Sequence, residues 1–111
     1  MRVAIYTCGD AYCGRLVWLA DAQEQDAPPL DRNNPDLSLR SRPLLGLEIL
    51  AGLRYRGEGT WDGGRMYAPQ RGRTVDVSFT HVNDLTLKVR ASKFIFRKTI
   101  LWTRVPSGYV Q

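Results

Sequence analysis

The sequence predicts an all-β protein that folds as one small antiparallel barrel. Three observations carry the prediction. Apolar and polar residues alternate with a period of two through most of the chain, turn-forming residues separate the alternating runs, and no run shows the period of a long helix. The 111 residues, 43% of them hydrophobic and 24% charged, fit a single globular domain spanning residues 1–111.

Seven strands are expected, joined mainly by hairpins. They span residues 2–7, 15–19, 47–55, 61–67, 75–81, 85–89 and 94–105, although a short helix also fits residues 47–55. The fourth strand contains Gly63 and Gly64, and glycine within a strand marks a bulge, a bend or a close backbone approach. After the seventh strand, Pro106 begins a polar tail. Because consecutive hairpin-linked strands pair with each other, the meander is expected to curl into a barrel.

The hairpin between the fifth and sixth strands tests this arrangement. A two-residue loop at 83–84 would place Phe79 opposite a lysine and waste one apolar face. A three-residue loop at 82–84 instead pairs Phe79 with Leu87. Because a shift of one residue turns every side chain to the other face, we predict the three-residue loop.

Residues 20–43 interrupt the alternation. This segment carries four prolines, two adjacent asparagines and five acids, and a loop of this length in a compact domain is usually functional or flexible. We predict a flap at the mouth of the barrel, pinned by Leu37 and Leu39. Asn34 would cap a single helical turn that has Pro35 in its first turn and runs through Leu39.

The chain has two cysteines, Cys8 and Cys13, which we expect to form a disulfide across the first hairpin. With residues 9–12 as the loop, the two thiols lie directly opposite each other and Ile5 pairs with Leu16. Facing residues lie ~4.5–5.5 Å apart at Cα, within reach of a disulfide. Free structural thiols, a metal site and a redox pair are the alternatives, although C-x4-C is not the usual redox spacing. A disulfide fits an oxidising compartment.

Other classes of function have less support. The net charge of +5 is compatible with a nucleic-acid partner, but the cations lie at alternating strand positions rather than in a cluster, so no nucleic acid is expected. No apolar run approaches the roughly 20 residues of a membrane span. His81 is expected to be a strand-end residue. No catalytic triad, phosphate loop or cofactor motif is recognisable, so an enzyme is unsupported and no cofactor is expected.

Acidic residues of the long segment are the remaining candidates for a cation site. They are Asp21, Glu24, Asp26, Asp31 and Asp36. However, residues 31–36 lack the glycine and the distal glutamate of a calcium loop, and two thiols with His81 are too few ligands for structural zinc. We expect a solvated loop and no metal.

The chain also resembles a known bacterial family. The matching motifs are Cys8-Gly9-x3-Cys13-Gly14-x-Leu16-Val17-Trp18-Leu19, Asn34-Pro35-Asp36, Arg42-Pro43-Leu44-Leu45-Gly46, Trp61-x-Gly63-Gly64-x2-Tyr67-x-Pro69 and Trp102-x-Arg104. They are similar to the family catalogued as domain of unknown function 2147, small exported proteins with a lipocalin-like barrel. The resemblance implies an up-and-down lipocalin-like barrel, a periplasmic or secreted location and binding of a small apolar ligand. It implies no catalytic residues.

The beginning of the chain departs from that family. Members usually start with a signal peptide and a strand carrying Gly-x-Trp, and this sequence shows neither. A barrel that lacks this strand has two open edges. We therefore expect either a start further upstream or an open barrel that forms a homodimer through an edge.

The expected function is binding of a small apolar or amphipathic molecule inside the barrel. The residues expected to line the interior are Trp18, Ile49, Leu53, Trp61, Tyr67, Phe79 and Trp102. The alternative is a structural or protein-interaction module of the bacterial envelope, which would dock an acidic partner on basic strand faces or on an open edge. The basic residues concerned are Lys88, Arg90, Lys93, Arg97 and Lys98.

Overall fold

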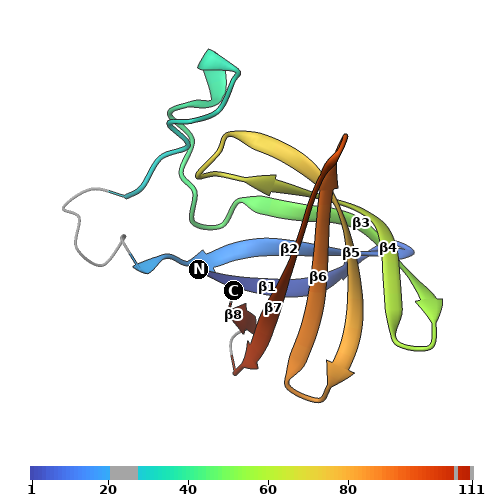
Figure 1. Ribbon diagram of the computed structural model, residues 1–111. Coiled ribbons are helices and arrows are strands. Elements are labelled where there is room, and N and C mark those ends of the chain that lie inside the picture. Colours follow the sequence, from blue (N-terminus) through green and yellow to red (C-terminus); the bar gives the residue numbers. More distant parts are fainter. Residues whose placement is uncertain (21–27, 107, 111) are drawn as a thin grey trace.

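The computed structural model describes residues 1–20, 28–106 and 108–110. In that part of the chain, eight antiparallel strands form a closed barrel in which each strand pairs with the next and the last returns to the first (Figure 1). The strands are β1 (Arg2–Cys8), β2 (Ala11–Trp18), β3 (Glu48–Gly57), β4 (Thr60–Ala68), β5 (Arg73–Asn83), β6 (Thr86–Lys93), β7 (Phe96–Val105) and β8 (Gly108–Val110). A short 3-10 helix, η2 (Leu37–Leu39), lies between β2 and β3. The predicted antiparallel barrel and its seven strands are confirmed.

Strand β8 closes the barrel, and the sequence did not predict it. Tyr109 lies opposite Val3 of β1 and opposite Arg104 of β7. Gly108 permits this approach, because a Cβ atom there would lie 2.3 Å from the carbonyl oxygen of Val3. The expectation of open edges is therefore wrong, since β8 fills the place between β7 and β1. The homodimer was predicted to form through an open sheet edge, and the closed barrel has no such edge among the described strands.

The first hairpin has a shorter loop than expected. Gly9 and Asp10 form a two-residue turn, so Tyr6, rather than Cys8, lies opposite Cys13. Gly9 has φ +63°, a left-handed conformation that suits a tight hairpin turn. The disulfide nonetheless joins Cys8 to Cys13, whose Cα atoms are 6.0 Å apart. The disulfide prediction is confirmed, whereas the predicted direct pairing of the cysteines is wrong.

The β5–β6 hairpin is also shifted by two residues. Phe79 pairs with Val89 instead of the expected Leu87. The turn lies at residues 84–85, and an irregularity at Val82 absorbs the additional residue. Because a shift of two residues preserves the face to which each side chain points, Phe79 is still in the core and is 3% exposed.

Side chains fill the middle of the barrel. The apolar side chains that are at most 1% exposed are Val3, Leu16, Leu50, Leu53, Val89 and Trp102. Gly64 allows the sheet to close over this core, because a Cβ atom there would lie 2.6 Å from Cγ of Leu53. The β4–β5 register shifts between Trp61 and Gly64, which confirms the irregularity predicted from the paired glycines.

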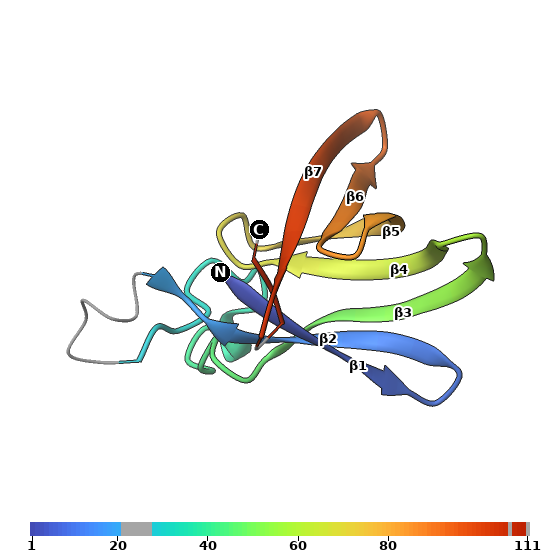
Figure 2. The same cartoon turned by 90° about the horizontal axis from the view of Figure 1, so that it is seen from below.

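The two ends of the barrel are built differently (Figures 1 and 2). The hairpin end, as we call it, contains the turns at residues 9–10, 58–59 and 84–85. The loop end contains residues 28–43 of the long segment, the connection at residues 44–47 and the turns at residues 69–72 and 94–95. Figure 2 shows the β6–β7 hairpin projecting away from strands β1–β4.

The long segment is not held by the leucines expected to pin it. Leu37 is 73% exposed and Leu39 is 36% exposed. Helix η2 confirms the helical turn through Leu39, but Asp36 rather than Asn34 is its cap, because the Asp36 carboxylate accepts a hydrogen bond from the backbone nitrogen of Ser38. The expected anchors are wrong because polar side chains of this segment, not its leucines, make the buried contacts with the barrel.

Candidate ligand-binding site

A pocket of about 350 Å³ lies at the hairpin end of the barrel. Its walls are mainly apolar or aromatic, and they include Ile5, Tyr12, Leu53, Trp61, Phe79, Leu87, Val105 and Tyr109. Pro106, Gly108 and two exposed polar residues, His81 and Arg104, complete the lining. His81 Nε2 lies 4.0 Å from a carboxylate oxygen of Asp84. A concave, mostly apolar site with few polar groups is typical of small-molecule binding.

Aromatic rings build one wall of this pocket. Trp61 of β4 meets Tyr12 of β2 edge to face, with ring centroids 6.5 Å apart, and lies 5.0 Å from the ring of Tyr55 of β3. Leu53 and Phe79 are 1% and 3% exposed and form the inner part of the pocket. Because these rings already pack against one another, the wall is formed without a ligand.

Three of the seven residues expected to line the interior border this pocket. They are Leu53, Trp61 and Phe79. Ile49 and Trp102 lie in the packed core instead, at 3% and 0% exposure. These five side chains face inward, as alternation predicted, but alternation did not separate core positions from pocket positions.

The other two expected residues lie away from the pocket. Tyr67 is at the loop end, where its hydroxyl donates to Asp31 over 2.6 Å. Trp18 is at the end of β2, and the guanidinium carbon of Arg2 lies 4.9 Å from the centroid of its ring. Neither is placed to contact a ligand bound among the hairpin-end residues.

Nine lining residues were not predicted to border a pocket: Ile5, Tyr12, His81, Leu87, Arg104, Val105, Pro106, Gly108 and Tyr109. Tyr12 was assigned to a hairpin loop, and the structure places it in β2. Tyr109 belongs to the strand that was not predicted. The available signal was the turn-forming sequence at residues 106–108, followed by two residues that favour strands.

Trp102 brings an unpaired hydrogen-bond donor close to the pocket. Its side chain is fully buried, and its indole Nε1 has no acceptor among the described residues. Its ring packs edge to face against Phe79, with centroids 5.1 Å apart, and Phe79 lines the pocket. Trp102 does not itself line the pocket, and a buried indole N–H normally has an acceptor, so this donor is an unsatisfied polar group of the core in the described part of the chain.

At the loop end, Asp31 ties the long segment to the barrel. Its side chain is buried and accepts hydrogen bonds from the Tyr67 hydroxyl (2.6 Å), Asn34 Nδ2 (2.8 Å) and Arg42 Nε (2.9 Å). Burial by itself would raise the pKa of Asp31, but these hydrogen bonds and the charge of Arg42 outweigh it and lower the pKa below 3.8. Burial and the neighbouring Asp31 carboxylate raise the pKa of Tyr67 to about 12.

A second contact holds the same segment. Asn33 Nδ2 donates to the carbonyl oxygens of Pro69 and Gln70 in the β4–β5 turn, at 3.2 Å each. Together with the Asp31 contacts, it places the described part of the segment at the loop end. The expectation of a flap at the mouth of the ligand pocket is wrong for these residues, because the pocket lies at the other end of the barrel.

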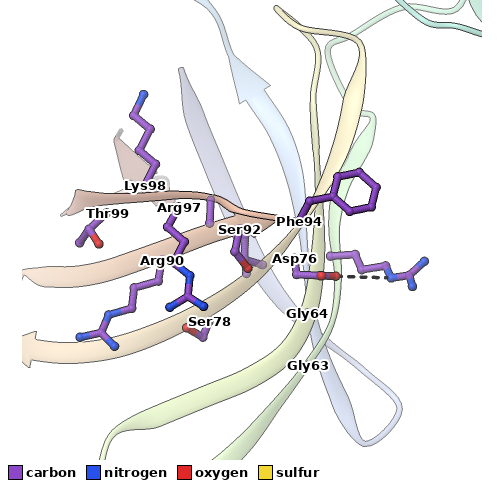
Figure 3. Close-up of a pocket in the computed structure, with 13 residues that line it drawn as sticks. Gly63, Gly64, Asp76, Ser78, Arg90, Ser92, Phe94, Arg97, Lys98 and Thr99 are labelled. Carbon is purple, nitrogen blue, oxygen red and sulfur yellow. Dashed lines mark ion pairs between the residues drawn. The ribbon is translucent and has the colours of Figure 1, made fainter.

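A larger depression of about 680 Å³, which we call the basic groove, lies on the outer face of β4–β7 (Figure 3). Its cationic residues are Arg65, Arg90, Arg97 and Lys98. The acid on its border is Asp76, whose carboxylate lies 3.9 Å from Arg65. Of the five basic residues expected to form a docking face, Arg90 and Arg97 lie on the same side of the sheet in this groove, whereas the side chain of Lys98 points away from them (Figure 3). Lys88 and Lys93 of β6 lie outside this lining.

The acids considered for a cation site are not gathered in the described part of the chain. No group of three or more His, Cys, Asp or Glu residues is placed there to hold a metal. Asp31 and Asp36 are engaged in hydrogen bonds within the long segment. Asp21, Glu24 and Asp26 lie outside the described residues. Among the described helices, none has the length and apolar character needed to span a membrane.

Comparison with known proteins identifies the family. Residues 1–104 match the family described as uncharacterized proteins conserved in bacteria, domain of unknown function 2147 (DUF2147). The chain belongs to this family. No curated protein matches the DUF2147 chain.

The DUF2147 barrel is similar to a solved structure, that of HP1028 from the human pathogen Helicobacter pylori, which is described as belonging to the lipocalin family. The TM-score is 0.82 at 23% sequence identity, and the match covers 93% of this chain and 70% of that chain. The likeness shows that the fold is a lipocalin-like barrel, as the resemblance in the sequence implied.

Proposed function

We propose that this DUF2147 barrel binds a small apolar or amphipathic molecule in the pocket at the hairpin end. The observation that carries the proposal is a pocket of about 350 Å³ walled by residues such as Leu53, Trp61 and Phe79. Small-molecule sites span roughly 300–1,000 Å³ and are lined mainly by apolar and aromatic groups. The pocket is near the lower limit, so the ligand is small. The packed core beneath the pocket keeps a longer molecule from passing through the barrel.

Arg104 favours a ligand with an anionic end. Its exposed side chain borders the apolar pocket and forms no ion pair with the described residues. His81, the other polar residue of the lining, has the carboxylate of Asp84 beside it. A molecule whose apolar body contacts the aromatic wall and whose anionic group reaches Arg104 would match both features.

Fluorescence titration with two related probes tests the proposal. 1-Anilinonaphthalene-8-sulfonate carries a sulfonate, and N-phenyl-1-naphthylamine has the same rings without the charge. We expect saturable binding of both, at one site per chain. Ile5→Phe adds bulk inside the pocket and is expected to weaken both probes about tenfold or more, equivalent to at least about 1.4 kcal/mol. Ile100→Phe makes the same change at the loop end and should leave binding unchanged.

The sulfonate separates the role of Arg104 from that of the apolar walls. Arg104→Gln should weaken the charged probe by about two- to fivefold and leave the neutral probe unchanged, because an exposed ion pair contributes at most ~1 kcal/mol. The proposal is refuted if folded wild-type protein binds neither probe saturably. It is also refuted if Ile100→Phe, rather than Ile5→Phe, weakens binding.

We propose further that the protein works in the periplasm or is secreted. The disulfide between Cys8 and Cys13 supports this location, because disulfides persist in oxidising compartments and are rare in the bacterial cytosol. Fractionation of the native bacterium, with thiol labelling during lysis, tests the location. Protein recovered in the cytosolic fraction with both thiols labelled would contradict it.

A further inference from the structure

We infer that the β6–β7 hairpin docks this protein onto an anionic lipid surface, with Phe94 and Ile95 entering the interface and the basic groove contacting the headgroups. The inference is independent of the proposed ligand pocket, which lies at the other end of the barrel.

The tip of the hairpin is strongly exposed and apolar. Phe94 is 93% exposed and Ile95 is 99% exposed, more than any other large apolar residue that the structure describes. Figure 2 shows the hairpin projecting away from strands β1–β4, so its tip is not covered from that side. Exposed apolar groups of this kind mark surfaces that contact another phase or a partner.

The backbone at Phe94 gives a second reason to assign the tip a role beyond folding. Phe94 has φ +56°, a conformation that hairpin turns normally give to glycine, asparagine or aspartate. An aromatic residue there is strained, and at 93% exposure its ring gains little from packing. Phe94 is thus conformationally unfavourable and gains little from packing within the protein. A contact between its ring and another molecule or surface would explain why it is there.

Positive charge adjoins the apolar tip. Phe94 itself borders the basic groove, in which Arg90 and Arg97 point to the same side, whereas Lys98 points away from them (Figure 3). Arg65 is the remaining cation of the lining. Asp76 lies near Arg65 at 3.9 Å, whereas no ion pair joins Arg90 or Arg97 to a described carboxylate. The hydroxyl-bearing residues of the groove are Ser78, Ser92 and Thr99. These side chains are hydrogen-bond donors suited to the phosphate oxygens of lipid headgroups.

The combination favours lipid over other polyanions. The cations alone would equally suit the acidic protein partner considered from the sequence. Binding of an acidic partner by these cations would not account for the two almost fully exposed apolar side chains at the tip. An interfacial element characteristically places aromatic and aliphatic side chains at the acyl boundary and Lys or Arg among anionic headgroups. Phe94, Ile95 and the groove have this arrangement.

Co-sedimentation with vesicles tests the inference. We use phosphatidylcholine vesicles with and without phosphatidylglycerol, at ~0.05 M and ~0.5 M salt. Wild-type protein should bind only the anionic vesicles, and the higher salt should weaken binding about tenfold or more. Arg90→Gln with Arg97→Gln should weaken it about 25-fold, because each cation contributes about fivefold near such a surface.

The apolar tip decides between specific docking and general attraction of a basic protein to anionic lipid. Phe94→Asn with Ile95→Ser should weaken vesicle binding about tenfold or more without lowering thermal stability, because both side chains are exposed and asparagine suits the φ of position 94. The matched control is Val82→Ser with Leu85→Ser in the β5–β6 hairpin, where these side chains are 50% and 60% exposed. It should bind as the wild type does, as should Arg32→Gln with Arg54→Gln, which removes two exposed arginines outside the groove.

Three outcomes would overturn the inference. The first is wild-type protein that does not bind anionic vesicles. The second is binding that the Phe94→Asn, Ile95→Ser variant retains in full. The third is binding of poly-glutamate that requires Arg90 and Arg97 but not the tip, in the absence of vesicle binding, which would assign the groove to an acidic protein. None of these outcomes affects probe binding in the hairpin-end pocket, so a failure here is distinguishable from a failure of the proposed function.

Discussion

The contacts of Asp31 predict a large effect of a small substitution, Asp31→Asn. Asparagine keeps the shape of the side chain and removes its charge. In the less costly orientation, the amide oxygen takes the place of the oxygen that accepts from Asn34 and Arg42, and the amide nitrogen donates to Tyr67. The Tyr67 hydroxyl can accept this hydrogen bond. In the reverse orientation, the amide nitrogen, itself a donor, would face the donors of Asn34 and Arg42.

The magnitude follows from the kinds of hydrogen bond that change. Bonds to a charged group contribute ~1.5–3 kcal/mol and neutral ones ~0.5–1.5 kcal/mol, so the bonds to Tyr67 and Asn34 each lose about 1 kcal/mol. The bond from Arg42 keeps one charged partner, and the Arg42 side chain is 33% exposed, so water compensates part of the lost ion pair. We expect the free energy of unfolding to fall by about 2–3 kcal/mol and Tm by roughly 10 °C.

The pH dependence gives the sharper assay. The pKa of Asp31 is lowered in the folded protein, so its stabilising effect is complete above the unfolded value of about 3.9 and is lost as the pH falls through the lower folded value. Urea unfolding should therefore show a difference between Asp31→Asn and wild type at about pH 7 that shrinks below about pH 3.9.

Asp76→Asn is the matched control, because its exposed carboxylate lies 3.9 Å from Arg65, which is also exposed. It should change the free energy of unfolding by less than about 0.5 kcal/mol. A difference for Asp31→Asn below 0.5 kcal/mol, or one that persists unchanged in acid, would refute the anchoring role of Asp31.

The disulfide and one close backbone contact give two further predictions. Replacing Cys8 and Cys13 with alanine should lower the free energy of unfolding by about 2 kcal/mol, measured by urea titration without reductant, and an unchanged value would exclude a loop-closure contribution. Gly72→Ala should lower Tm several degrees more than Gly9→Ala in differential scanning calorimetry. Both glycines have φ near +62°, but a Cβ atom at Gly72 would lie 1.7 Å from the carbonyl oxygen of Asn33, whereas Gly9 has nothing within 4 Å; equal losses would show that this contact is unimportant.

The fold was largely predictable because most strands carry a recognisable pattern in their own sequence. Alternation depends only on neighbouring residues, so β1 to β7 could be recognised from the sequence. Strand β8 has three residues, too few for alternation to stand out, and it exists because β1 and β7 offer unpaired backbone groups on both sides. A partner in space, rather than a local pattern, makes these residues a strand.

The anchoring of the long segment could not be predicted for a related reason. Leucines in a polar segment suggest packing, and aspartates suggest solvent. Here Leu37 is exposed and Asp31 is buried. The Asp31 carboxylate can be buried because Tyr67, which is 36 positions away in sequence, and Arg42 supply its hydrogen bonds. Sequence shows the charge that must be neutralised, but only the fold shows which donors neutralise it.

The candidate pocket shows most clearly what alternation can and cannot establish. Alternation assigns a side chain to the inner or outer face, and a two-residue error in register leaves that assignment intact. The same error moves a residue by ~7 Å relative to the neighbouring strand, since each residue advances ~3.4 Å. That distance separates a core position from a position at the pocket. Trp102 and Trp61 both point inward, yet one fills the core and the other walls the pocket. Locating a binding site in such a barrel therefore requires the turn lengths, which Gly9 and Val82 determine here, in addition to the pattern of apolar residues.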